Sequence, residues 1–114
     1  MSNVLLLGLE PSLADELSRA LTQLGHGIQL ATLNTREWET SDADVIFAPS
    51  ADLRTILRTR TDLPVVVASR MPEVSAWLDA LQDGAADYCG APFEATQLSW
   101  ILRSTLGSPQ AQAA

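Results

Sequence analysis

The chain has 114 residues, and its net charge of −7 argues against nucleic acid as a direct partner. Its basic side chains are all arginines, so no lysine is present for a Schiff base or for a phosphate-binding loop. No apolar run is long enough to span a membrane, the first residues lack the basic region of a signal peptide, and a single cysteine forms no internal disulfide, so we expect a cytoplasmic protein.

Short apolar runs alternate along the chain with segments of helical spacing. The runs that predict β-strands are 4–7, 28–31, 45–48, 64–68 and 86–89, of which 28–31 is the weaker and 64–68 the clearest. The segments that predict helices are 13–24, a short or irregular one within 34–44, one around 53–57, 72–83 and 93–106. Ser12 and Ser50 are candidate N-caps, and Gly25, Gly84 and Gly107 are candidate helix stops.

The segment 72–83 has the clearest helical stripe. Pro72 suits the first turn of a helix. Val74, Trp77, Leu78 and Leu81 then recur at the spacing of one helical face. We expect Val74, Leu78 and Leu81 to point into the core, whereas Trp77 has two possible places, described below.

Strands that are apolar on both faces and separated by helices predict a parallel sheet covered on both sides. Right-handed crossovers then lead to a doubly wound α/β domain over residues 1–106. Residues 107–114 are expected to be a disordered tail or the start of a linker. In such domains chemistry gathers at the carboxyl ends of the strands.

The second half of the chain resembles a bacterial response-regulator receiver domain. The residues that carry this likeness are Pro64, Ser69, the run Gly84-Ala85-Ala86-Asp87-Tyr88 and the run Ala91-Pro92-Phe93. The first half fits more loosely, through the apolar strands that end at Gly8 and at Pro49. The resemblance implies a five-stranded sheet of order 2-1-3-4-5, a cis peptide bond between Ala91 and Pro92, and a place in a two-component or phosphorelay pathway.

The resemblance also implies a reaction that these residues do not support. A receiver takes a phosphoryl group onto an aspartate beside Mg²⁺, which two further acids hold and a lysine assists. Here Gly8 and Leu9 stand at the positions of the acidic pair, Pro49 at the acceptor and Ala91 at the lysine. Only Ser69 and an aromatic switch residue, Tyr88, remain. We therefore expect a pseudo-receiver that is not an enzyme and uses no metal or cofactor.

Two alternatives stay open at the strand ends. Phosphorylation at a displaced residue would use Asp52 or Ser69, although Asp52 is expected to open a helix, where its charge is favourable. A small-ligand sensor would use the vacated pocket and contact Ser69 or Arg70. His26 is expected at a surface turn, and Cys89 in the core.

The output of such a domain is expected at its surface. Receivers signal through the face formed here by the helix over 72–83, the strand over 86–89 and the helix over 93–106. Trp100 is out of phase with the inward stripe of the last helix, so we expect it to be exposed, with Arg103 as a polar neighbour. Trp77 either fills the core or joins Trp100 on this face. The sequence thus predicts a protein partner or a homodimer there, with no direct nucleic-acid or membrane contact.

Overall fold

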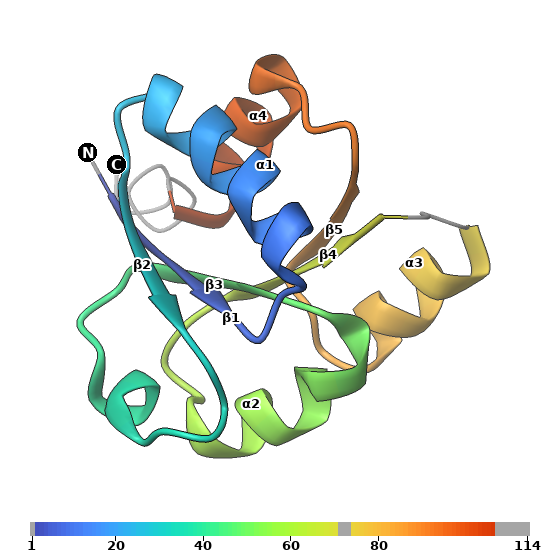
Figure 1. Ribbon diagram of the computed structural model, residues 1–114. Helices are drawn as coiled ribbons and strands as arrows, with labels where there is room; N and C mark the ends of the chain where they lie inside the picture. Colours follow the sequence, from blue (N-terminus) through green and yellow to red (C-terminus); the bar gives the residue numbers. More distant parts are fainter. Residues whose placement is uncertain (1, 71–73, 107–114) are drawn as a thin grey trace, which may run out of the picture.

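The computed structural model describes residues 2–70 and 74–106, and these residues form a parallel sheet between two layers of helices (Figure 1). The strands are β1 (Asn3–Leu7), β2 (Gly27–Ala31), β3 (Val45–Ala48), β4 (Val65–Ser69) and β5 (Asp87–Gly90). Their order in the sheet is β2-β1-β3-β4-β5, and every neighbouring pair is parallel. The predicted fold class and strand order are confirmed.

The helices divide between the two faces of the sheet. They are α1 (Pro11–Gln23), α2 (Leu53–Thr59), α3 (Val74–Gln82) and α4 (Ala95–Leu106), with short 3₁₀ turns η1 (Glu37–Thr40) and η2 (Ser50–Asp52). In Figure 1, α1 and α4 cover one face, whereas η1, α2 and α3 cover the other. The segment 34–44 thus contains a 3₁₀ turn, in agreement with the short or irregular helix expected there.

Each face of the sheet has its own apolar core, because successive residues of a strand point to opposite faces. On β3, Val45 and Phe47 pack with Leu17 and Leu98 under α1 and α4. Ile46 and Ala48 of the same strand pack with Ile56 and Trp38 under α2 and η1. Cys89 is buried in the first of these cores, so its predicted role as a small core residue is confirmed.

Trp38, from the short 3₁₀ turn η1, is the aromatic residue that this segment contributes to the second core. Its indole is buried, and the main chain beside it is held by the buried Arg60. The Arg60 guanidinium donates to the carbonyl oxygens of Trp38 and Ser41, each at 3.0 Å. It also forms a two-point contact with the Asp62 carboxylate at 2.9 and 3.0 Å. A planar cation thereby fixes a segment that has little regular structure of its own.

Two of the predicted caps are wrong, and two helix stops are confirmed. Ser12 and Ser50 are not N-caps: Pro11 already stands in the first turn of α1, and Ser50 lies within η2, ahead of α2. Gly25 and Gly84 follow the ends of α1 and α3 with φ of 91° and 110°, a conformation that glycine adopts without steric cost. Pro72, Gly107 and the tail 107–114 lie outside the described residues.

The largest departure from expectation is the orientation of α3. Its stripe of Val74, Trp77, Leu78 and Leu81 is exposed by 69%, 43%, 49% and 37%. Ala80 is the buried residue of this helix. The prediction that Val74, Leu78 and Leu81 point into the core is therefore wrong: the small side chain of Ala80 faces the sheet, and the large apolar ones face outward.

In the described part of the chain, no helix combines the length and the apolar character needed to cross a bilayer.

Candidate functional site

The predicted positions meet at one edge of the sheet. Gly8 and Pro49 directly follow β1 and β3, Ser69 is the last residue of β4, and Ala91 directly follows β5. Because the strands are parallel and paired almost in register, all four lie at the carboxyl ends of neighbouring strands. The Ala91 amide donates to the Ser69 carbonyl at 2.9 Å, which ties the last two strand ends together.

Asp52 reaches the same edge from the end of η2. A Cβ added to Gly8 would lie 3.0 Å from Asp52 Oδ2, 3.6 Å from Leu33 Cδ1 and 3.9 Å from Pro49 Cδ. Gly8 also has a φ of +72°, where an L side chain is strained. The space that a side chain at position 8 would enter is thus bounded by the Asp52 carboxylate. Asp52 opens α2 as its N-cap residue, as predicted, without a side-chain cap hydrogen bond.

Leu9 turns away from this edge. It is half-buried and packs against the core beneath α1 and α4. The two residues that follow β1 therefore contribute one glycine to the site edge and one leucine to the core.

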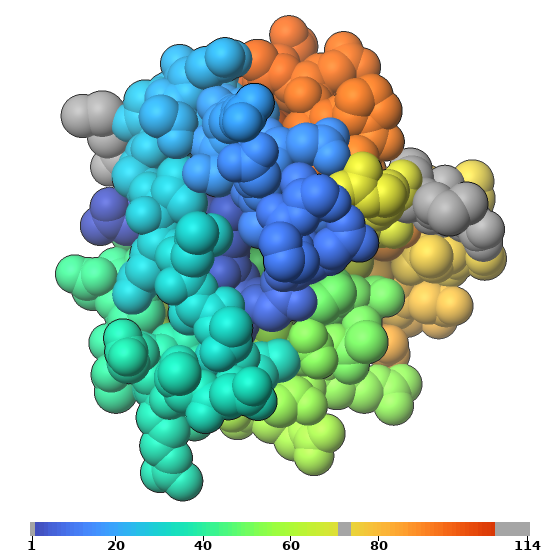
Figure 2. Space-filling view, in the orientation of Figure 1, coloured from blue at the N-terminus to red at the C-terminus, as the bar shows by residue number. Residues whose placement is uncertain are grey.

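Arg70 links the end of β4 to the start of α1. Its guanidinium lies 3.0 Å from Glu16 Oε2 and 3.2 Å from Glu10 Oε1, and it donates to Ser12 Oγ at 2.7 Å. Ser12 Oγ in turn donates to Glu10 Oε1. Figure 2 shows the yellow atoms at the end of β4 beside the blue atoms at the start of α1. Arg70 thus remains partly exposed while it pairs with two carboxylates.

This cluster changes the acidity of Glu10. The hydrogen bond from Ser12, together with the nearby charge of Arg70, holds the pKa of the Glu10 carboxyl below its ordinary value of 4.5. Arg70 is 54 to 60 positions away from the residues it contacts, so no spacing pattern reveals the cluster.

A second candidate site is a groove along the β5 edge of the sheet. It has a volume of about 760 Å³ and lies between α3 on one face and α4 on the other, with β5 along its base. Trp77 and Trp100 both line it, together with Tyr88, Asp87 and Glu94. Trp100 is 67% exposed, as predicted, and Trp77 joins it on the same face. Arg103 is exposed on α4 but is not among the lining residues.

A comparison with models of known protein families finds no match. The DNA-binding transcriptional regulator NtrC of Rhizobium meliloti (strain 1021) is 28% identical over 105 residues, covering 82% of this chain and 22% of that protein. The chain therefore spans about a fifth of the length of this relative.

Two solved structures match nearly the whole chain. A two-component response regulator from Clostridium difficile superposes with a TM-score of 0.77 at 20% identity, over 96% of this chain and 98% of that one. The receiver domain of NtrC4, solved as a beryllofluoride-activated dimer, superposes with a TM-score of 0.72 at 23% identity, over 92% and 97%. The chain has the receiver-domain fold.

The receiver fold implies a Mg²⁺ site at the ends of β1 and β3, and the residues present do not fit one. The side chains of Gly8, Leu9 and Pro49 have no oxygen donor. Asp52 brings one carboxylate to the edge, and Glu10 is occupied by Ser12 and Arg70. Within 2–70 and 74–106, no three His, Cys, Asp or Glu side chains gather as a metal site.

One further expectation from the resemblance is confirmed. The Ala91–Pro92 peptide bond is cis. Tyr88 is half-buried, packs against the core beneath α2 and lines the groove. Burial, with the Asp87 carboxylate nearby, raises the pKa of the Cys89 thiol to about 12, so the reactive thiolate is disfavoured. His26 is partly exposed at the turn into β2, as expected.

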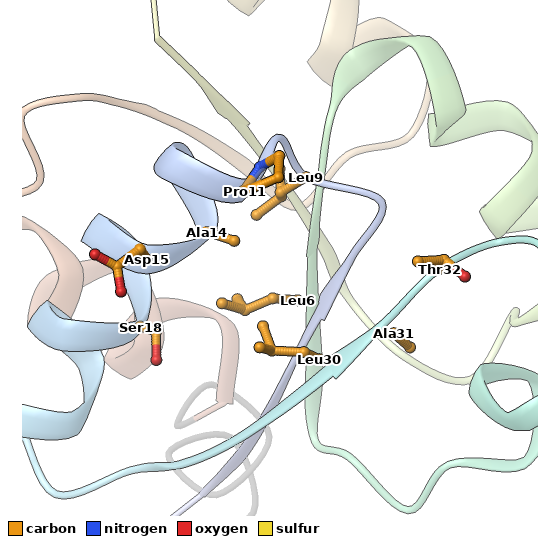
Figure 3. A pocket seen from close by; sticks show the side chains of 9 residues that line it. All are labelled: Leu6, Leu9, Pro11, Ala14, Asp15, Ser18, Leu30, Ala31 and Thr32. Atoms are coloured by element: carbon orange, nitrogen blue, oxygen red, sulfur yellow. The ribbon is translucent and has the colours of Figure 1, made fainter.

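A smaller hollow of about 400 Å³ lies between α1 and β2 (Figure 3). Leu6 and Leu30, from neighbouring strands, point to the same side toward α1, where Leu9 and Ala14 close the hollow. The lining does not include Ser69 or Arg70, so it differs from the pocket that a strand-end ligand sensor would use.

Proposed function

We propose that the chain is a receiver-like signalling domain that acts by protein–protein contact without phosphorylation. It works in the cytoplasm as part of a two-component or phosphorelay pathway that regulates transcription. The observation that carries the proposal is the outward apolar stripe of α3, which meets Trp100 across the β5 groove. A domain that exposes this much apolar surface on one face is expected to bind a partner there.

The strand-end edge supports the first half of the proposal. It offers proline where an acceptor carboxylate is required, and alanine where a lysine is required. Arg70, the residue that follows β4, is held by Glu10 and Glu16 and is thus already tied to α1 without a phosphoryl group. The domain is therefore proposed to be a binding module and not an enzyme, with no metal and no cofactor.

The relatives suggest where such a module acts. NtrC of Rhizobium meliloti is described as a DNA-binding transcriptional regulator, and the NtrC4 receiver domain forms a dimer. By analogy, the groove face of α3, β5 and α4 binds either another protein or a second copy of this chain. With a net charge of −7, the domain itself is not proposed to touch DNA.

A second candidate is a receiver that is phosphorylated at an unusual residue. The observation that favours it is the Asp52 carboxylate, which lies at the strand-end edge next to Gly8 and Pro49. Ser69 stands at the same edge, at the end of β4. The absence of an acidic pair and of a lysine around them weighs against this candidate.

Acetyl phosphate with Mg²⁺ distinguishes the two candidates. We expect the intact mass of the chain to stay unchanged, and the amide spectrum of α3 to stay as it was. A gain of one phosphoryl group that is lost in Asp52→Asn or Ser69→Ala would overturn the phosphorylation-independent function. Asp42→Asn, an exposed carboxylate before β3, is the matched control.

A further inference from the structure

The groove face contains more than a pair of tryptophans. Val74, Trp77, Leu78 and Leu81 follow one another at the i, i+3, i+4 and i+7 positions of α3, so they form one continuous ridge. Amphipathic helices normally bury this kind of ridge. Here it lies on the outside of α3, beside the groove that Trp77 and Val74 line.

The opposite wall of the groove is built from α4. Trp100 is the most exposed tryptophan of the described residues, and Ile101 continues the wall towards the core. Thr96 and Gln97 lie one turn earlier and add polar groups. The floor is the edge strand β5, which has four residues and therefore offers few main-chain groups to an added strand.

The charge of the groove has one sign. Among the described residues, Asp87 on β5 and Glu94 before α4 line it, and no arginine does. Asp79 and Asp83 add carboxylates to α3 and to its end, although Asp83 is paired with Arg54 at 3.2 Å. A partner that covers the apolar ridge must therefore approach carboxylates that lack a cation within the groove.

We infer that the occupant of the groove is an amphipathic helix of another protein, with an apolar stripe flanked by lysine or arginine. The inference rests on the proposed docking function and specifies its partner. An apolar stripe at helical spacing fits between two helical walls, and basic flanks complement Asp87 and Glu94. A second copy of this chain fits less well, because it brings a net charge of −7 and the same acidic groove.

Three synthetic peptides of about 18 residues, long enough to form a helix, test the inference against the full 114-residue chain by calorimetry. One has leucine at helical spacing and lysine elsewhere. The second replaces lysine with glutamate. The third keeps the leucine–lysine composition but alternates the two residues at the spacing of a β-strand. We expect the first peptide to bind at least tenfold more tightly than either of the others.

Variants of the chain locate the binding site. Trp100→Ala and Trp77→Ala should each weaken the first peptide at least tenfold, because exposed aromatic residues dominate the energy of such contacts. Leu30→Ala, an exposed leucine on β2 at the other edge of the sheet, should leave binding unchanged. Glu94→Gln should weaken binding several-fold and reduce its salt dependence, whereas Glu37→Gln on η1 should not.

Several outcomes would overturn the inference. Equal binding of the lysine and glutamate peptides would remove the charge complementarity, and tighter binding of the alternating peptide would point to strand addition at β5. Binding that ignores both tryptophan substitutions would place the site elsewhere. Self-association that Trp100→Ala abolishes would make a second copy the occupant, while leaving the proposed docking function intact. Phosphorylation by acetyl phosphate would instead overturn the phosphorylation-independence of the proposed function, and not the docking at the groove on which the inference rests.

Discussion

Gly8 and Asp52 show how the strand-end edge is built. Gly8 has a left-handed backbone, and the Asp52 carboxylate occupies the direction in which a side chain would extend. A single residue exchange at position 8 therefore meets two obstacles, one from the backbone and one from the carboxylate. Glycine is therefore the residue that fits position 8 best.

Gly8→Ala should lower the free energy of unfolding by about 1–2 kcal/mol, because the added Cβ is strained at a φ of +72°. Urea denaturation measures the change. In the double variant Gly8→Ala/Asp52→Ala the contact at 3.0 Å is removed while the backbone strain stays. Full recovery of stability in the double variant would show that the carboxylate, and not the backbone, makes glycine necessary.

Arg70 joins two carboxylates across the start of α1 and should control the acidity of Glu10. In Arg70→Gln the pKa of Glu10 should rise towards 4.5, and only part of the lowering should remain, because Ser12 still donates to the carboxylate. NMR titration of the Glu10 carboxyl measures the shift. Arg19→Gln, which removes the exposed Asp15–Arg19 pair on α1, should leave the pKa of Glu10 unchanged.

The lowered pKa of Glu10 makes the stability of the folded chain depend on pH. Because the pKa of Glu10 is lower in the folded chain than in the unfolded chain, its stabilising contribution is present above the unfolded value. The contribution is lost as the pH falls through the lower, folded value. Unfolding measured over this acidic range should therefore depend less on pH in Arg70→Gln than in the unchanged chain, and an unaltered dependence would contradict the role of Arg70.

The element that departs most from its sequence pattern is α3. Spacing predicts correctly that Val74, Trp77, Leu78 and Leu81 share one face, but not which face meets the sheet. Ala80 occupies the inward position, where a small side chain lets the helix approach the core formed under α2. An apolar stripe at helical spacing therefore identifies residues that share one helix face, but it does not show whether that face packs against the sheet.

Two substitutions on α3 test its orientation. Leu78→Lys should change the free energy of unfolding by less than about 0.5 kcal/mol, because Leu78 is half exposed. Ala80→Leu should cost about 1–3 kcal/mol, since the larger side chain overfills a buried position. Thermal or urea unfolding of both variants gives the comparison, and the reverse order of effects would mean that the stripe faces inward.

The segment 34–44 shows a different limit of sequence patterns. It has no apolar stripe, yet it supplies the buried Trp38, and Arg60 from the end of α2 holds its carbonyl groups. A single tryptophan carries no periodicity, so its burial depends on a contact with a distant arginine. The strands, by contrast, agree with their apolar runs to within a residue. For the inner strands β1, β3 and β4 the reason is burial on both faces, which demands an unbroken apolar stretch.

The molecule as a whole combines an acidic sequence with the groove along β5. A net charge of −7 opposes the approach of two copies, and Asp87 and Glu94 place part of this charge in the groove itself. The second hollow lies between α1 and β2 and is lined mainly by apolar side chains. It is therefore near the β2 edge of the sheet, whereas the groove lies along the β5 edge. The groove is therefore the surface where a partner of opposite charge has most to gain.

The charge predicts how the purified chain behaves in solution. At micromolar concentration and low ionic strength, sedimentation velocity should show a monomer, because like charges repel over about 10 Å or more under these conditions. Added salt should screen this repulsion and favour any weak association through the groove. A stable dimer at low salt that Trp100→Ala dissociates would contradict this expectation.

The sequence by itself determined the order of strands and helices along the chain and the residue types at the strand ends. Both follow from local properties: apolar runs define strands, and Gly8, Leu9, Pro49 and Ala91 have no acidic or basic side chain wherever they are placed. Only the tertiary structure decided that Arg70 pairs with Glu10 and Glu16, and that the α3 stripe faces outward. Such features depend on residues that are distant in the chain and on which helix face meets the sheet, and neither leaves a periodic signal in the sequence.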